Sequence, residues 1–128
     1  MKRLETAAII LSLLVVGCEP HDPGPSFTQD VAPILKRNCV MCHMEGGALG
    51  ELSLHPQPHA ALVGAASVQT DLVLVAPCDV EASYLYHKML GSHLDVGGEG
   101  ESMPFPDLLA EEDITVIEQW IARGAREN

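Results

Sequence analysis

The chain has 128 residues, enough for one small domain with a modest hydrophobic core. Its formal net charge of −11 disfavours a nucleic-acid partner and charge-driven adhesion to an anionic lipid surface, because both require a basic patch. The same charge favours fast, salt-sensitive encounters with a basic patch on another protein, with simple solubility as the alternative.

The first part of the chain is typical of an export signal. Residues 1–17 begin with the charged pair Lys2 and Arg3 and continue with an apolar run of ten residues, 7–16, which is too short to span a bilayer. The run ends in Val-Val-Gly before Cys18, which resembles a bacterial lipobox. The resemblance implies cleavage before Cys18 and lipid attachment to it, whereas an ordinary secretory signal would leave a chance cysteine there. Either way, the rest of the chain is exported.

Residues 18–26 predict a short extended tether, because they contain three prolines and a glycine. A domain over 27–128 follows. It opens with a predicted helix over 27–38, whose apolar residues at 27, 31, 34 and 35 share one helical face. Pro33 is tolerated only in the first turn of a helix, which favours Asp30 over Thr28 as the N-cap.

The most specific motif of the chain follows this helix. Cys39, Cys42 and His43 fit C-x-x-C-H, the attachment motif of a c-type haem. The two thiols form thioethers with the porphyrin vinyl groups, and the adjacent histidine binds the iron from one face. The motif therefore predicts one covalent haem c, whose bulk would fill a core poor in aromatic residues. A chain without haem would then be loosely folded.

Two other uses of a C-x-x-C pair are less favoured. A zinc site of this kind needs four nitrogen or sulfur ligands, and the remaining cysteines, Cys18 and Cys78, are single and far apart. A thioredoxin-like dithiol lies between a strand and a helix, whereas the residues before Cys39 predict a helix.

The middle of the chain predicts short elements. A glycine-rich turn covers 44–50, Leu52 and Leu54 are expected at the haem edge, and 59–64 predicts a short helix. The apolar run 72–75 is compatible with either a strand or a helix.

Two further helices are predicted toward the C-terminus. Asp79 is expected to cap a helix over 80–90, and residues 93–102 predict a surface loop. The last helix is expected over 111–123. Its apolar residues recur at helical spacing: Ile114, Ile117, Trp120 and Ile121.

Met103 is the favoured ligand for the second face of the iron. It lies sixty positions beyond His43, so the loop can pass around the haem edge, and prolines at 104 and 106 stiffen the segment. A histidine ligand or an open position are the alternatives. The other candidates have a poorer position or context: Met41, Met44, Met89, His55, His59, His87 and His93.

This order of motifs resembles the small single-haem cytochrome c domain of bacterial exported lipoproteins, over about residues 27–125. The matching residues after Cys39-x-x-Cys42-His43 are Pro77, Asp79, Ser83-Tyr84-Leu85, Met103-Pro104, Trp120-Ile121 and Gly124-Ala125. The resemblance implies an all-α, cytochrome-c-like fold of about three to five helices wrapped around one covalent haem, with the first and last helices crossing near it. It also implies thioethers at Cys39 and Cys42 and axial ligation by His43 and Met103.

Two residues depart from that family pattern. Relatives often have glycine at the position of Cys78 and a serine or threonine cap at the position of Ala110. Cys78 is expected to be a small buried residue, with an intermolecular disulfide or a reactive thiol as alternatives.

These features predict a membrane-anchored carrier of single electrons on the periplasmic side of a bacterial membrane, with no catalytic residue of its own. An aspartate directly after the lipidated cysteine resembles an inner-membrane retention signal of enteric bacteria. Glu19 occupies that position here, which weakly favours the outer membrane. Redox partners with basic docking patches are expected. Asp95, Glu99 and Glu101 would favour Fe(III) if they lie near the haem. The alternatives are a subunit of an oxidoreductase complex, a haem enzyme such as a peroxidase, a haem-based redox or gas sensor, and a non-haem dithiol lipoprotein.

Overall fold

The computed structural model describes residues 18, 23–46 and 49–128. The predicted signal sequence 1–17 and part of the predicted tether therefore lie outside the described residues. Helices dominate the described part, as the all-α prediction required, and its β contacts are isolated bridges. None of the described helices is long and apolar enough to cross a membrane. In chain order the helices are η1 (Phe27–Val31), α1 (Ala32–Asn38), η2 (Leu49–Glu51), α2 (Pro58–Leu62), α3 (Tyr84–Leu90), η3 (His93–Val96) and α4 (Glu111–Ala122).

The predicted first helix is present as the π-helical turn η1 followed directly by α1. The four apolar residues predicted to share a face are buried: Phe27, Val31, Ile34 and Leu35. The N-cap prediction was wrong, because Ser26 caps this helix through its hydroxyl oxygen, which accepts from the N–H of Gln29 at 3.3 Å. Asp30 instead accepts from the N–H of Ser26 at 2.7 Å. The π turn comes first, so Pro33 still falls in the first turn of α1, where its missing N–H costs little.

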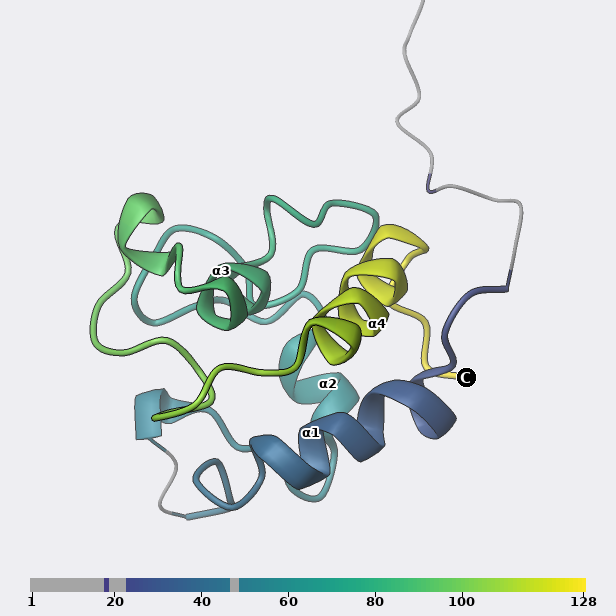
Figure 1. Cartoon of the computed structure of the whole chain (residues 1–128), viewed down its shortest axis with the longest axis horizontal. Coiled ribbons are helices and arrows are strands. Elements are labelled where there is room, and N and C mark those ends of the chain that lie inside the picture. Colours follow the sequence, from purple (N-terminus) through teal and green to yellow (C-terminus); the bar gives the residue numbers. More distant parts are fainter. Residues whose placement is uncertain (1–17, 19–22, 47–48) are drawn as a thin grey trace, which may run out of the picture.

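The C-terminal helix α4 packs on the start of this first helical segment. The rings of Phe27 and Trp120 lie with their centroids 5.3 Å apart, and the backbone N–H of Thr28 donates to the carbonyl oxygen of Asn128 at 2.9 Å. The C-terminus therefore lies beside the start of η1 (Figure 1). This contact joins the two ends of the domain in one core.

Helix α3 begins four residues later than predicted. Asp79 accepts a hydrogen bond from the N–H of Ala82 at 3.0 Å, but this bond closes a turn and caps no helix. The hydroxyl of Ser83 donates to the carbonyl oxygen of Asp79 at 2.7 Å, which holds Ser83 in that turn. The chain becomes helical only at Tyr84.

Three other segments can be compared with their predicted structures: 59–64, 72–75 and 93–102. The short helix predicted over 59–64 is present as α2. The run 72–75 forms isolated bridges instead of a regular element, and only Val75 of the run is buried. The predicted surface loop over 93–102 begins with η3, and His93 in it is only 3% exposed.

Helix α4 has a poor N-cap, which offers a simple gain in stability. Ala110 has the extended backbone of an N-cap, with φ −60° and ψ 143°, and no side-chain capping bond. We expect Ala110→Ser to raise the free energy of unfolding by about 1 kcal/mol, because its hydroxyl can accept from an unpaired N–H of the first turn. Denaturant unfolding of the two proteins measures this. Ala110→Val is the control and should give no gain, since valine offers no acceptor.

Candidate functional site

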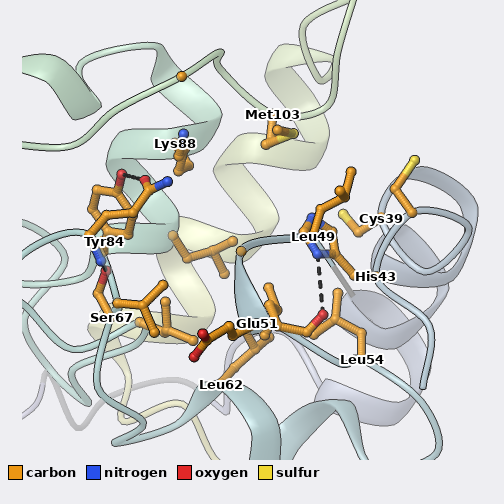
Figure 2. Close-up of a pocket in the computed structure, with 18 of the residues that line it drawn as sticks. Cys39, His43, Leu49, Glu51, Leu54, Leu62, Ser67, Tyr84, Lys88 and Met103 are labelled. Atoms are coloured by element: carbon orange, nitrogen blue, oxygen red, sulfur yellow. Dashed lines mark hydrogen bonds between the residues drawn. The ribbon is translucent and has the colours of Figure 1, made fainter. Parts of the chain in front are cut away.

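A cavity of about 450 Å³ opens between the end of α1, the 49–54 segment, α3 and the loop over 99–105. Its size lies in the range of cavities that hold a small-molecule ligand or cofactor, about 300–1,000 Å³. Figure 2 shows the side chains that surround it. Aliphatic residues supply most of the wall: Leu35, Leu49, Leu52, Leu54, Leu62, Val68, Leu74 and Leu85. The cavity therefore suits a largely apolar group.

The C-x-x-C-H residues line one end of this cavity. Cys39 ends α1, and its N–H donates to the carbonyl oxygen of Leu35 at 2.9 Å. The chain then turns at once, because the N–H of His43 donates to the carbonyl oxygen of Cys39 at 3.1 Å. This tight turn brings Cys39, Cys42 and His43 to the same cavity.

The His43 ring is oriented by the backbone of the segment opposite. Its Nδ1 lies 3.3 Å from the carbonyl oxygen of Leu52 (dashed in Figure 2). A carbonyl oxygen only accepts hydrogen bonds, so Nδ1 is the protonated nitrogen in this contact. The other nitrogen, Nε2, then keeps its lone pair, which is the form in which a neutral imidazole binds a metal. Leu52 was expected to line the site, but no feature of the sequence indicated this role for its carbonyl group.

Met103 reaches the same cavity from a different segment (Figure 2). Its N–H donates to the carbonyl oxygen of Lys88 at 2.9 Å, which joins the 99–105 loop to α3. Among the described methionines and histidines, only His43 and Met103 line the cavity. Met89 is buried in the core at 3% exposure, and Met41 is 88% exposed. The other methionine and histidine candidates for the second axial position are therefore all away from the cavity. Ligation by Met103 stays a prediction, with an open position as its alternative.

The far end of the cavity is polar. The hydroxyl of Tyr84 donates to the side-chain oxygen of Gln69, and the ammonium of Lys88 donates to the carbonyl oxygens of Glu99 at 2.7 Å and Glu101 at 2.8 Å. With the Met103 contact, Lys88 thus holds the 99–103 segment at three points. Glu99 and Glu101 line the cavity, whereas Asp95 does not, and an effect of these carboxylates on a haem stays a prediction.

The other two cysteines are paired with each other. Cys18 and Cys78 form a disulfide with their Cα atoms 4.8 Å apart. Cys78 is only partly buried, so the expectation of a small buried residue was wrong, and in the disulfide state Cys78 is neither a free thiol nor part of an intermolecular bond. Its φ of 70° lies in the left-handed region, which a glycine at this position would adopt without cost. A sulfur in a disulfide carries no lipid, so this bond and the predicted lipidation are alternative states of Cys18.

The raised pKa of Cys39 argues against a role of Cys39 and Cys42 as a redox-active dithiol. Burial, and next the nearby charge of Cys42, raise the pKa of the Cys39 thiol to about 11. A reactive dithiol needs the opposite shift, because the thiolate is the nucleophile.

No group of three or more His, Cys, Asp or Glu side chains that could hold a metal ion occurs among the described residues.

No family model, curated protein or solved structure matches the chain. The site consists of two thiols and an oriented imidazole at one end of an apolar cavity, a thioether from a second segment, and a polar far end.

Proposed function

We propose that the chain is a mono-haem c-type cytochrome that carries single electrons between redox partners on the exported side of a bacterial membrane. One observation carries the proposal. The apolar cavity is lined by both cysteines of the C-x-x-C-H motif and, among the described histidines and methionines, only by His43 and Met103. The donor set of two thioether-forming thiols, one imidazole and one methionine suits a covalently held, six-coordinate haem.

Each residue has a definite part in this proposal. Cys39 and Cys42 would hold the porphyrin, and His43 and Met103 would bind the iron. When bound, the haem supplies a reversible one-electron couple between Fe(III) and Fe(II). The hydrogen bond from His43 to Leu52 orients the ring and keeps the lone pair of Nε2 available for the iron. The aliphatic wall excludes water and so sets the local dielectric, which tunes the potential.

The charge of the chain indicates the type of partner. A net charge of −11, with Glu51, Glu99 and Glu101 at the cavity, favours redox partners that dock through a basic patch. Electron exchange with such a partner should slow as ionic strength rises, because salt screens the attraction.

The mass of natively produced protein tests the function. A c-type cytochrome weighs one haem more than its polypeptide, even after denaturation, because the thioethers are covalent. Its reduced and oxidised absorption spectra should differ reversibly, and a weak red band in the oxidised form should report methionine ligation. A denatured mass equal to that of the polypeptide and any acyl groups would refute the proposal.

The membrane anchor is a separate proposal, since Cys18 is either lipidated or bonded to Cys78. If the lipobox is used, Cys18→Ser should release the protein from membranes, whereas Cys78→Ser should leave it bound. Fractionation and intact mass under non-reducing conditions measure both. A soluble wild type that is two hydrogen atoms lighter than its reduced form would show the disulfide in place of the lipid.

A further inference from the structure

The polar end of the cavity contains one cationic side chain. Of the lysines and arginines among the described residues, Lys88 alone lines the cavity. Figure 2 shows it above Tyr84, on the opposite side of the view from Cys39 and His43. Its ammonium uses two of its three protons on the carbonyl oxygens of Glu99 and Glu101, and no described carboxylate lies within 4.0 Å of it. One donor therefore remains for a ligand.

The chemistry of a porphyrin decides what should approach this donor. The two vinyl groups lie on one side of the macrocycle and the two propionate chains on the other. Thioethers at Cys39 and Cys42 would keep the vinyl side at the cysteine end of the cavity. The propionates would then extend toward the polar end, where Tyr84 and Gln69 also lie.

We propose that Lys88 binds a propionate carboxylate of the haem and so fixes the orientation of the porphyrin in the cavity. This inference rests on the proposed function and extends it to a specific ion pair. An ammonium–carboxylate hydrogen bond is among the stronger polar contacts in proteins. Lys88 also holds the 99–103 segment, through its ammonium at Glu99 and Glu101 and through its backbone carbonyl at Met103. The carboxylate and Met103 would therefore be connected through one residue.

The charges around Lys88 fit this role. Burial lowers the pKa of its ammonium, and the carboxylates of Glu101 and Glu99 oppose that shift from the loop. Tyr84 lies one turn earlier on α3 with its ring centroid 5.9 Å from the Lys88 Nζ, and Glu51 lies elsewhere along the cavity wall. Behind the loop, the Nε2 of His93 lies 2.9 Å from the carbonyl oxygen of Gly100.

Haem and its dimethyl ester test the ion pair, because the ester lacks the carboxylate charges. In full-length chain with Cys39→Ala and Cys42→Ala, haem binds reversibly and the dissociation constants of both compounds follow from absorbance titrations. We expect Lys88→Gln to weaken the binding of ferric haem by about tenfold and to leave the binding of the ester within about twofold. Because both ligands are compared in one protein, any cost of folding the apo chain cancels. Lys88→Arg should retain the preference for the free acid.

Lys36→Gln is the matched control, since it removes the same charge from an exposed position on α1. An equal loss for haem and ester, or no loss for either, would overturn the inference. In native protein with its haem attached, Lys88→Gln should also lower the reduction potential, because loss of a nearby positive charge favours Fe(III), and an unchanged potential would count against the pair. Failure of the proposed function is distinguished by the mass of the wild type, which then shows no haem.

Discussion

A chain that cannot attach haem is expected to lose its cooperative unfolding transition. Cys39→Ala with Cys42→Ala removes both thioethers and would leave an apolar cavity of about 450 Å³ unfilled after removal of the haem. At about 24 cal/mol per Å³, an uncollapsed cavity of that size costs on the order of 10 kcal/mol, an upper value because the wall can relax. A small domain has a total stability of about 5–15 kcal/mol, so this one change can remove most of it.

The loss should spread into the core, because the cavity wall and the core share residues. Leu35, Leu54 and Leu62 line the cavity and belong to the buried cluster that includes Phe27 and Trp120. Loss of near-ultraviolet circular dichroism with retained helical signal, together with binding of a hydrophobic dye, would identify the loosely packed state. Cys18→Ala with Cys78→Ala is the control, since it removes two cysteines outside the cavity and should retain haem. A sharp, unshifted thermal transition in the haem-free chain would contradict the prediction.

Replacement of Met103 by alanine should abolish methionine ligation while the haem stays attached. The weak red band of the oxidised form should vanish, and the reduction potential should fall, because a thioether ligand stabilises Fe(II). The ferrous form should also bind carbon monoxide rapidly through the open position. The free energy of unfolding should fall by less than for truncation of a fully buried methionine, since Met103 is only partly buried.

Met89→Ala should reduce stability and leave the absorption spectrum unchanged. Met89 is buried at 3% exposure and lies outside the cavity wall, so its truncation should cost about 2–5 kcal/mol and leave the red band in place. Absorption spectra and thermal unfolding of the two variants give this comparison directly. A wild type that already binds carbon monoxide rapidly would favour a sensor or an enzyme, and a red band that persists in Met103→Ala would remove Met103 as the ligand.

The sequence predicted the elements whose signals are local. The helices over 27–38 and 111–123 were predicted from apolar spacing, and the residues on those faces are buried except Ile114, which is partly buried. Helix starts were less predictable. The sequence places Ser26 in the tether and predicts Asp79 as a cap. Both predictions fail because capping depends on which turn the chain has already formed.

In the candidate site, too, the contacts between near neighbours in the chain were predictable from the sequence and the long-range contacts were not. By itself, the sequence determined that Cys39, Cys42 and His43 lie together, because five consecutive residues in one tight turn cannot separate. Only the tertiary structure decided which methionine shares their cavity, which carbonyl oxygen orients His43, and that Cys18 lies against Cys78. It also brought Lys88 to the polar end of that cavity. These contacts join residues far apart in the chain, and they depend on how the helices pack around the cavity and not on any neighbouring residue.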